Sequence, residues 1–523
     1  MNYPLSEFVA KRARSAAAVA LFLASFVFLI YLSHHFSPTG LNHDEAYLIN
    51  LARQLAAGNG FVTPVLWQLY LDPDALPMPY GGTAGPLPSI LIAACILLFG
   101  ESFFVMQLPG MLLGSLIAPL TFLLGNRLGL SEWRAFAAGG VTAIHPFLAY
   151  NANEIMTDVP FAAFILLSFL LLYSRSTAAS NIALGVSWGL AYLCRYQATL
   201  FIVVLIAAWK VGKQRSLRDI AIATGAFVVT AFPWFVRNML VFGNPLFTYA
   251  SRYFWLIAHV PEQVQIVRRT TPPPDQISFL LGNLNVYVSA LLGRVKALMF
   301  YARDALAPNA ALGLGLLVVL FRERREWRIA FPILVYGVIV TLFFLTSYLE
   351  PRYLLSLAPF LVIGGVGGLA YLNREHDPPW RFSRLIEPGL VIAVICAYMV
   401  VDSIRLADTE GRASFHGRAE TAYNTREFFQ EFPPWSFAIM ATAPEHFALF
   451  HNQYAVSFPF DVEKDLQRLT AKYRVRFVVL QDDEAEQFER VLPVIGGTYE
   501  KVFRARNAHV YEAVAGKFED KDS

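Results

Sequence analysis

Two neighbouring carboxylates, Asp44 and Glu45, follow the first long apolar segment of the chain. Charged groups at the edge of a membrane are costly unless they are paired, hydrated or used. A carboxylate there acts as a general base when it takes the proton of an acceptor hydroxyl. On their own, however, these two residues are explained equally well as the acidic first turn of a helix. A catalytic interpretation therefore needs further polar groups on the same side of the membrane.

Further acids and arginines stand at the ends of later apolar segments. Arginine offers planar, permanently charged donors to a phosphate. Acids and arginines together are typical of a polar cavity that holds an anionic lipid head group and a hydroxylated acceptor. The chemistry they indicate is sugar transfer from a lipid phosphate. The candidates are Glu154, Asp158, Arg195, Arg237, Glu350 and Arg352.

Several of these residues also have purely structural explanations. Arg237 follows a Pro-Trp pair and fits an interfacial anchor at least as well as a ligand-binding residue. Glu350 and Arg352 could simply pair with each other, whereas the position of Arg195 in a tight turn between apolar segments favours a functional role. The histidines at positions 34, 35 and 43 resemble a metal cluster, but their spacing is not diagnostic, so metal dependence stays open.

The composition identifies a membrane protein. Of 523 residues, 56% are hydrophobic and 15% are charged, against about 25% charged in soluble domains. Repeated apolar runs of about 18–25 residues indicate a polytopic helical protein. The net charge of +3 is too small to indicate a nucleic-acid partner.

The basic residues set the orientation of the chain. Lys11, Arg12 and Arg14 place the N-terminus in the cytoplasm by the positive-inside rule. The run from Pro88 to Phe99 is too short to cross comfortably, so we expect a re-entrant or interfacial helix there. About eleven crossings then put the acids and arginines outside and the basic clusters 210–218 and 322–325 inside. The predicted crossings include Phe103–Leu124, Ala135–Tyr150, Val159–Tyr173, Ile182–Cys194, Ala198–Trp209, Ile220–Val236, Tyr301–Phe321, Ile329–Thr346, Tyr353–Leu372 and Pro388–Val401.

The chain divides into two domains. Residues 1–403 form the membrane domain, with outer loops at 33–102 and 237–300 and a short amphipathic helix at 42–57. From residue 404 to 515 the composition is that of a soluble domain, and a βαβαβ rhythm predicts a small α/β domain with a parallel core. We expect residues 516–523 to be disordered.

The order of these motifs resembles the GT-C superfold of glycosyltransferases that use polyprenyl-phosphate sugars. The nearest groups are the bacterial relatives of protein O-mannosyltransferases and of the lipid A aminoarabinose transferase, over roughly residues 15–400. One departure is Ala84-Gly85, where the aminoarabinose transferases have a Glu-Lys pair before the juxtamembrane helix. The resemblance rests on Asp44-Glu45-Ala46-Tyr47, Gly85-Pro86-Leu87-Pro88, Asn153 to Asp158, Pro233 to Asn238 and Pro351-Arg352-Tyr353-Leu354.

The resemblance implies an inverting glycosyltransferase. Such an enzyme would transfer a monosaccharide from a polyprenyl-phosphate donor to a lipid, polysaccharide or protein acceptor. The reaction would take place on the extracytoplasmic face of a bacterial inner membrane. Asp44 is implied as the base, with Glu45 and Asp158 orienting the acceptor or a divalent metal. The resemblance also implies that the donor phosphate is bound by Arg352, Arg195 and Arg237. Supporting residues of the site would be Glu154, His43 and Tyr353. A transporter or flippase is the main alternative, followed by a non-catalytic protein that organises the envelope.

Overall fold

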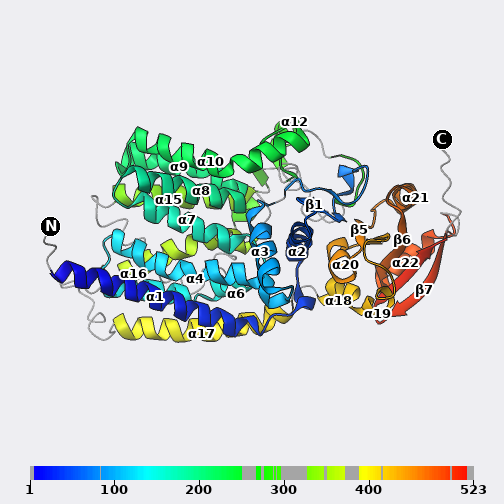
Figure 1. The fold of residues 1–523 in the computed structure, drawn as a ribbon, viewed down its shortest axis with the longest axis horizontal. Helices are drawn as coiled ribbons and strands as arrows, with labels where there is room; N and C mark the ends of the chain where they lie inside the picture. Colours follow the sequence, from blue (N-terminus) through cyan, green and yellow to red (C-terminus); the bar gives the residue numbers. More distant parts are fainter. Residues whose placement is uncertain are drawn as a thin grey trace.

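The computed structural model describes residues 5–82, 84–249, 267–272, 276–286, 288–289, 291–295, 327–346, 350–371, 388–413, 416–494 and 498–514. A bundle of long helices occupies one end of the molecule and an α/β domain the other (Figure 1). Between them lie helix α2 (His43–Ala56), helix α3 (Leu87–Phe99) and the loop that joins these two helices.

The bundle has the character of a membrane domain. Within the described residues, four helices are long and apolar enough to cross a membrane, namely α1, α4, α10 and α15, and shorter apolar helices accompany them. Val27, Val229 and Leu240 lie on these helices and expose 65, 73 and 80% of their surface, as side chains that face lipid do. The bundle helices are α1 (Leu5–Ser33), α4 (Phe103–Arg127), α5 (Glu132–Ala143), α6 (Pro146–Asn153), α7 (Asp158–Leu172), α8 (Ala178–Cys194), α9 (Phe201–Ala207), α10 (Leu217–Phe242), α15 (Trp327–Thr346), α16 (Ala358–Tyr371) and α17 (Pro388–Ala413).

Small residues bring some of these helices into close contact. A methyl group added to Gly185 of α8 would lie 2.1 Å from the carbonyl oxygen of Ala223 in α10. Close approach of this kind holds helices together where the surrounding lipid gives little hydrophobic drive. Helices α8 and α10 are therefore closely packed neighbours in the bundle.

The short apolar run from Pro88 to Phe99 forms a helix, α3, and its re-entrant or interfacial position stays a prediction. Its 13 residues begin after Pro86, and prolines fit the first turn of a helix because no backbone partner is lost there. Helix α3 packs between α2 and α4, and the Ser89 hydroxyl donates a hydrogen bond of 3.2 Å to the Leu48 carbonyl of α2. It therefore connects α2 to the bundle.

The α/β domain is built on a six-stranded sheet with the order β2-β5-β4-β6-β8-β7. The predicted parallel core is confirmed, since β4 pairs parallel to both β5 and β6. Strand β2, from the first outer loop, extends this sheet by pairing parallel to β5. The strands are β2 (Val65–Leu66), β4 (Ala438–Ala441), β5 (Tyr454–Ser457), β6 (Val475–Gln481), β7 (Tyr499–Ala505) and β8 (Ala508–Ala513), and a separate short pair joins β1 (Val62–Thr63) to β3 (Met78–Pro79). The helices are α18 (His416–Asn424), α19 (Arg426–Phe429), α20 (Pro444–His451), α21 (Val462–Tyr473) and α22 (Asp482–Val491).

Several helix ends differ from the sequence-based predictions. Helix α10 continues past Val236 to Phe242 and ends at Gly243, whose φ of 69° lies in the left-handed region. Helix α17 runs past the expected boundary at residue 404, since a polar sequence continues a helix as well as an apolar one does. The predicted crossing 135–150 is broken between α5 and α6, and the predicted 353–372 begins as the 3-10 turn η6 (Pro351–Leu357). The predicted crossing Tyr301–Phe321, the basic cluster 322–325 and the tail 516–523 lie outside the described residues.

Candidate active site between α2 and the membrane helices

Asp44 lies in the first turn of α2, which Asn42 caps by accepting the Glu45 backbone N–H at 3.0 Å. The cap fixes the direction in which the turn presents its acids. Asp44 Oδ2 accepts a hydrogen bond of 2.7 Å from Arg352 Nη2. The Asp44 side chain is 55% exposed, whereas that of Arg352 is 16% exposed. Asp44 is thus a carboxylate that is both paired with a cation and accessible.

Glu45 is buried and holds two segments together. Its Oε2 accepts the Asn42 N–H at 2.8 Å, and its Oε1 accepts the Ile155 N–H at 2.8 Å. Burial raises the pKa of Glu45 to about 7, although both backbone hydrogen bonds oppose the rise. Glu45 therefore completes the capping box of α2 and ties that helix to the loop before α7. The cap explanation of the acidic pair thus applies to Glu45.

Two further acids approach from the α6–α7 junction. Glu154, at the end of α6, is buried, and its pKa rises to about 8 because of burial and then because of the charge of Glu45. Asp158 begins α7 and forms an ion pair with Arg195, the residue that ends α8. The buried Oδ2 of Asp158 has no hydrogen-bond partner, which leaves one acceptor atom unused.

The turn η6 adds the remaining polar residues. Burial lowers the pKa of Arg352, but the nearby carboxylates of Asp44 and Asp158 outweigh it and keep this pKa well above its ordinary value. Arg195 stacks on the ring of Tyr353 with its guanidinium carbon 4.4 Å from the ring centre. Burial raises the pKa of Glu350, and the charge of Arg352 opposes the rise. Arg352 therefore remains charged, and the guanidinium groups of both arginines lie beside the Tyr353 ring.

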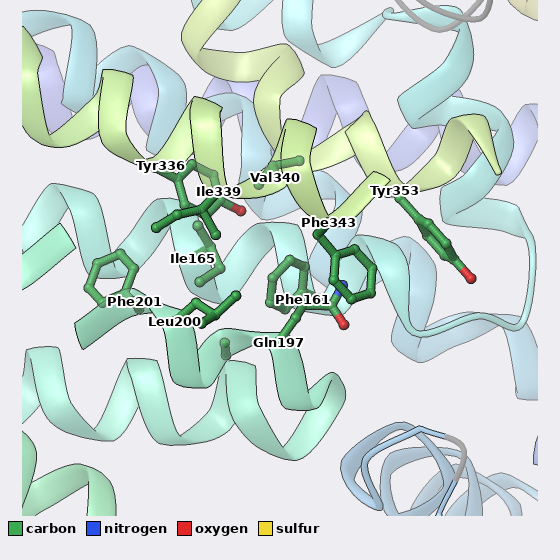
Figure 2. A pocket seen from close by; sticks show the side chains of 11 residues that line it. Phe161, Ile165, Gln197, Leu200, Phe201, Tyr336, Ile339, Val340, Phe343 and Tyr353 are labelled. Atoms are coloured by element: carbon green, nitrogen blue, oxygen red, sulfur yellow. The ribbon is translucent and has the colours of Figure 1, made fainter. Parts of the chain in front are cut away.

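An apolar hollow adjoins this cluster (Figure 2). It is lined mainly by aromatic and aliphatic side chains, with Tyr353 at one end. Because Arg195 stacks on Tyr353, its guanidinium group lies directly beside the apolar lining of the hollow. A hollow of this kind suits a ligand with an apolar chain and an anionic head. The lining includes Phe161 and Ile165 of α7, Phe201 of α9, and Tyr336 and Phe343 of α15.

Arg237 has a different environment from the other two arginines. It donates hydrogen bonds to the carbonyl oxygens of Tyr80 at 2.5 Å and Phe61 at 3.1 Å. Its guanidinium also lies 4.9 Å from the centre of the Trp234 ring. These contacts hold the first outer loop against α10. Binding of the lipid phosphate by Arg237 stays a prediction.

The three histidines of the suggested metal cluster bind three separate partners. His34 contacts the Ile30 carbonyl, His35 contacts Asp408 of α17, and His43 pairs with Glu445 of α20. Sequence reasoning missed Glu445 because it lies in the other domain, 402 residues away along the chain. The adjacent residues Glu445 and His446 after a proline were a signal that the sequence did contain.

Comparisons with known proteins identify the fold. Residues 83–236 match the family model described as dolichyl-phosphate-mannose-protein mannosyltransferase. This segment runs from before α3 to α10 and includes Asp158 and Arg195. The structure of ArnT from Cupriavidus metallidurans bound to undecaprenyl phosphate superposes with a TM-score of 0.58 and 15% identity, covering 98% of this chain and 99% of that one. The chain has the GT-C fold.

Other GT-C structures agree with this assignment. The apo oligosaccharyltransferase of Archaeoglobus fulgidus gives a TM-score of 0.57 at 11% identity, covering 94% of this chain and 74% of that one. The mycobacterial arabinofuranosyltransferase AftD gives 0.51 at 13% identity, over 97% of this chain and 40% of that one. No curated protein sequence matches the chain.

These matches confirm the predicted GT-C fold, and the match of residues 83–236 agrees with the predicted resemblance to protein O-mannosyltransferases. Sugar transfer by this chain stays a prediction. The roles of individual residues stay predictions.

Proposed function

We propose that the chain transfers one sugar from a polyprenyl-phosphate donor to a lipid, polysaccharide or protein acceptor on the extracytoplasmic face of a bacterial inner membrane. The observation that carries the proposal is the apolar hollow that ends at Tyr353 beside Arg195. The apolar lining of the hollow suits an isoprenoid chain, and the adjoining arginines suit its phosphate. The ArnT structure with the same fold was solved with undecaprenyl phosphate.

The proposed reaction is a single displacement. The oxygen of the acceptor hydroxyl forms a bond to the anomeric carbon of the sugar, while the bond from that carbon to the donor phosphate breaks. Asp44 takes the hydroxyl proton, and its 55% exposure and pairing with Arg352 suit that task. The electron pair of the broken bond leaves with the polyprenyl phosphate. Attack from the face opposite the phosphate inverts the anomeric centre.

Arg352 and Arg195 receive the phosphate in this scheme. A leaving phosphate gains negative charge as its bond to the sugar breaks, and charged donors fixed in place stabilise that state. The Nε of Arg352 is buried without a hydrogen-bond partner and is therefore unused by the protein. Tyr353 supports Arg195 by stacking, and Asp158 fixes it by the ion pair.

The acids divide into reacting and positioning groups. Both carboxylate oxygens of Glu45 accept hydrogen bonds from backbone N–H groups. Glu45 is therefore suited to holding the turn that carries Asp44 in position. The unused Oδ2 of Asp158 suits an acceptor hydroxyl. Among the described residues, Asp44, Glu45 and Asp158 do not form a group of metal-type ligands, so no step is assigned to a metal at these three acids.

The proposed topology rests on the basic residues that lie at one end of the bundle. Arg14, near the start of α1, pairs with Glu132 at the start of α5. Arg215 lies just before α10 and donates to the Leu171 and Ser174 carbonyls at the end of α7. We assign this basic end to the cytoplasm by the positive-inside rule. Helix α2 and the α/β domain lie at the opposite end (Figure 1).

The test is transfer by the purified full chain in lipid nanodiscs, supplied with undecaprenyl-phosphate sugars and an envelope extract. Asp44→Asn should lower the rate by about 10²–10⁴-fold, the usual contribution of a general base. Glu101→Gln is the matched control, because Glu101 is also an arginine-paired and exposed acid. Near-normal transfer by Asp44→Asn would overturn the assignment. Mass spectrometry of envelope glycans from a deletion strain would identify the missing sugar.

A further inference from the structure

The first turns of α2 and α20 meet at a buried cluster of two histidines and one glutamate. His43 opens α2, while Glu445 and His446 are the second and third residues of α20. Their three ligand atoms lie within 4.8 Å of one another. His446 is fully buried and Glu445 is 2% exposed, whereas His43 retains 25% exposure. The cluster thus lies at the junction of the two domains.

Hydrogen bonding fixes which nitrogen of His446 carries the proton. His446 Nε2 lies 2.9 Å from the Leu41 carbonyl oxygen. A carbonyl only accepts, so Nε2 must be the N–H donor, and in a neutral ring Nδ1 then carries the lone pair. Histidines that bind metals usually donate their other N–H to a carbonyl or carboxylate in this way. The ring is therefore oriented with its lone pair toward the cluster.

The Glu445 carboxylate lies between the two imidazole rings of the cluster. His446 Nδ1 lies 3.5 Å from Glu445 Oε1, and the same oxygen contacts His43 Nδ1. The other oxygen, Glu445 Oε2, is buried and has no hydrogen-bond partner. A buried carboxylate is costly unless a cation compensates it. A cation among these three side chains would compensate the charge and use the unpaired oxygen.

We propose that His43, Glu445 and His446 form a site for a Zn²⁺-like divalent ion that joins the α/β domain to α2. Two imidazoles and one carboxylate are an established zinc ligand set with one position left open. Bonds of about 2.0–2.1 Å would draw the three ligand atoms to about 3.3 Å from one another. The exposed edge of His43 gives the ion access.

The ion would act on the active site through α2. The residue after His43 is Asp44, and two more hydrogen bonds run beside the cluster. Asn50 Nδ2 donates to the Glu445 carbonyl at 2.8 Å, and Arg53 Nη1 donates to the Leu449 carbonyl at 2.5 Å. The site would therefore fix the turn that carries Asp44. Metal binding itself does not depend on the proposed function.

The test is metal analysis of the full chain, purified in detergent without a histidine tag. After chelation and reloading with ZnCl₂, the protein should retain about one Zn²⁺ per chain. His446→Ala and Glu445→Gln should lose it, whereas the control His35→Ala should keep it. A chelator should lower the melting temperature of the wild type but not that of His446→Ala. Equal zinc content in wild type and His446→Ala would overturn the proposal.

A spectroscopic measurement covers the case in which the variants do not fold. Titration of the wild-type chain with CoCl₂ should produce the visible absorption bands of tetrahedral Co²⁺, and ZnCl₂ should remove them. Absence of both bound zinc and these bands in the folded wild type would overturn the proposal. Neither measurement needs a sugar donor, so failure here would leave the proposed transferase function unaffected.

Discussion

Asp44 Oδ2 lies 2.7 Å from Arg352 Nη2, although 308 residues separate the two along the chain. The contact joins the first outer loop to the turn η6 that precedes α16. It places the proposed base, Asp44, next to Arg352, a residue proposed to bind the phosphate. The proton acceptor and the site of the leaving group are therefore adjacent.

Arg352→Lys should weaken donor use while leaving the fold intact. Lysine keeps the positive charge but loses the planar fork that reaches Asp44 and a phosphate together. Loss of one charge-assisted hydrogen bond is worth about 1.5–3 kcal/mol, so kcat/KM for the donor should fall by about 10–150-fold. Steady-state kinetics in nanodiscs would measure this.

The matched control for that change is Arg468→Lys. Arg468 pairs with Asp72 in an exposed setting at 3.2 Å, where the exchange should alter kcat/KM by less than twofold. An Arg352→Lys enzyme with wild-type kinetics would contradict the assignment of Arg352 to the phosphate.

The stability of the protein should fall as the pH rises from about 5 to 8. Burial raises the pKa of Glu154 to about 8 from an ordinary value of 4.5. The folded protein therefore binds this proton more tightly than the unfolded chain does. The resulting stabilisation is fully present below pH 4.5 and is lost as the pH rises through 8. Thermal unfolding in detergent at a series of pH values would measure it.

Glu154→Gln should make that pH dependence less steep, because glutamine stays neutral throughout the range, while the raised pKa of Glu45 leaves part of the slope in place. Glu486→Gln serves as the control, since Glu486 is an exposed acid in the α/β domain, and it should leave the slope unchanged. A slope that is equally steep in Glu154→Gln would show that another group causes it.

Local patterns in the sequence were sufficient to predict most helices and the parallel strands. Apolar runs identified α4, α7, α8 and α15, and the βαβαβ rhythm identified the parallel core of the α/β domain. The ends of α10 and α17 were missed because hydropathy marks where a membrane stops, not where a helix stops. Strand β2 was missed because two residues form no pattern, and its partner β5 is nearly 400 residues away.

The same distinction holds for the candidate site. Residue types and topology brought Asp44, Asp158, Arg195 and Arg352 to one end of the bundle. The choice of partner could not be predicted: Glu350 and Arg352 are close in sequence, yet Arg352 forms its ion pair with Asp44. The contact of His43 with Glu445 needed the packing of one whole domain on the other.

Arg237→Gln should lower stability more than it changes donor binding. The guanidinium donates to the Tyr80 and Phe61 carbonyls and so holds the outer loop on α10. Losing these hydrogen bonds should lower the melting temperature by roughly 2–4 °C. The donor KM should stay within twofold of the wild type. A KM raised tenfold with unchanged melting would instead support phosphate binding by Arg237.

Gly85 stands where the aminoarabinose transferases have part of a charged pair, and the structure gives a reason for glycine there. Its N–H donates to the Cys194 carbonyl at 3.0 Å. A Cβ atom at this position would lie 2.1 Å from the Leu193 carbonyl oxygen. The loop before α3 therefore rests directly on the end of α8, next to Arg195.

Gly85→Ala should displace the end of α8 and with it Arg195. Overpacking of this kind costs about 1–3 kcal/mol, and a displaced Arg195 should lower kcat/KM for the donor by at least about tenfold. Gly225→Ala is the matched control, because a Cβ atom on Gly225 of α10 meets no heavy atom within 4 Å. Kinetics and thermal unfolding of the two variants side by side would decide. If both behave as wild type, contact between this loop and α8 does not position Arg195.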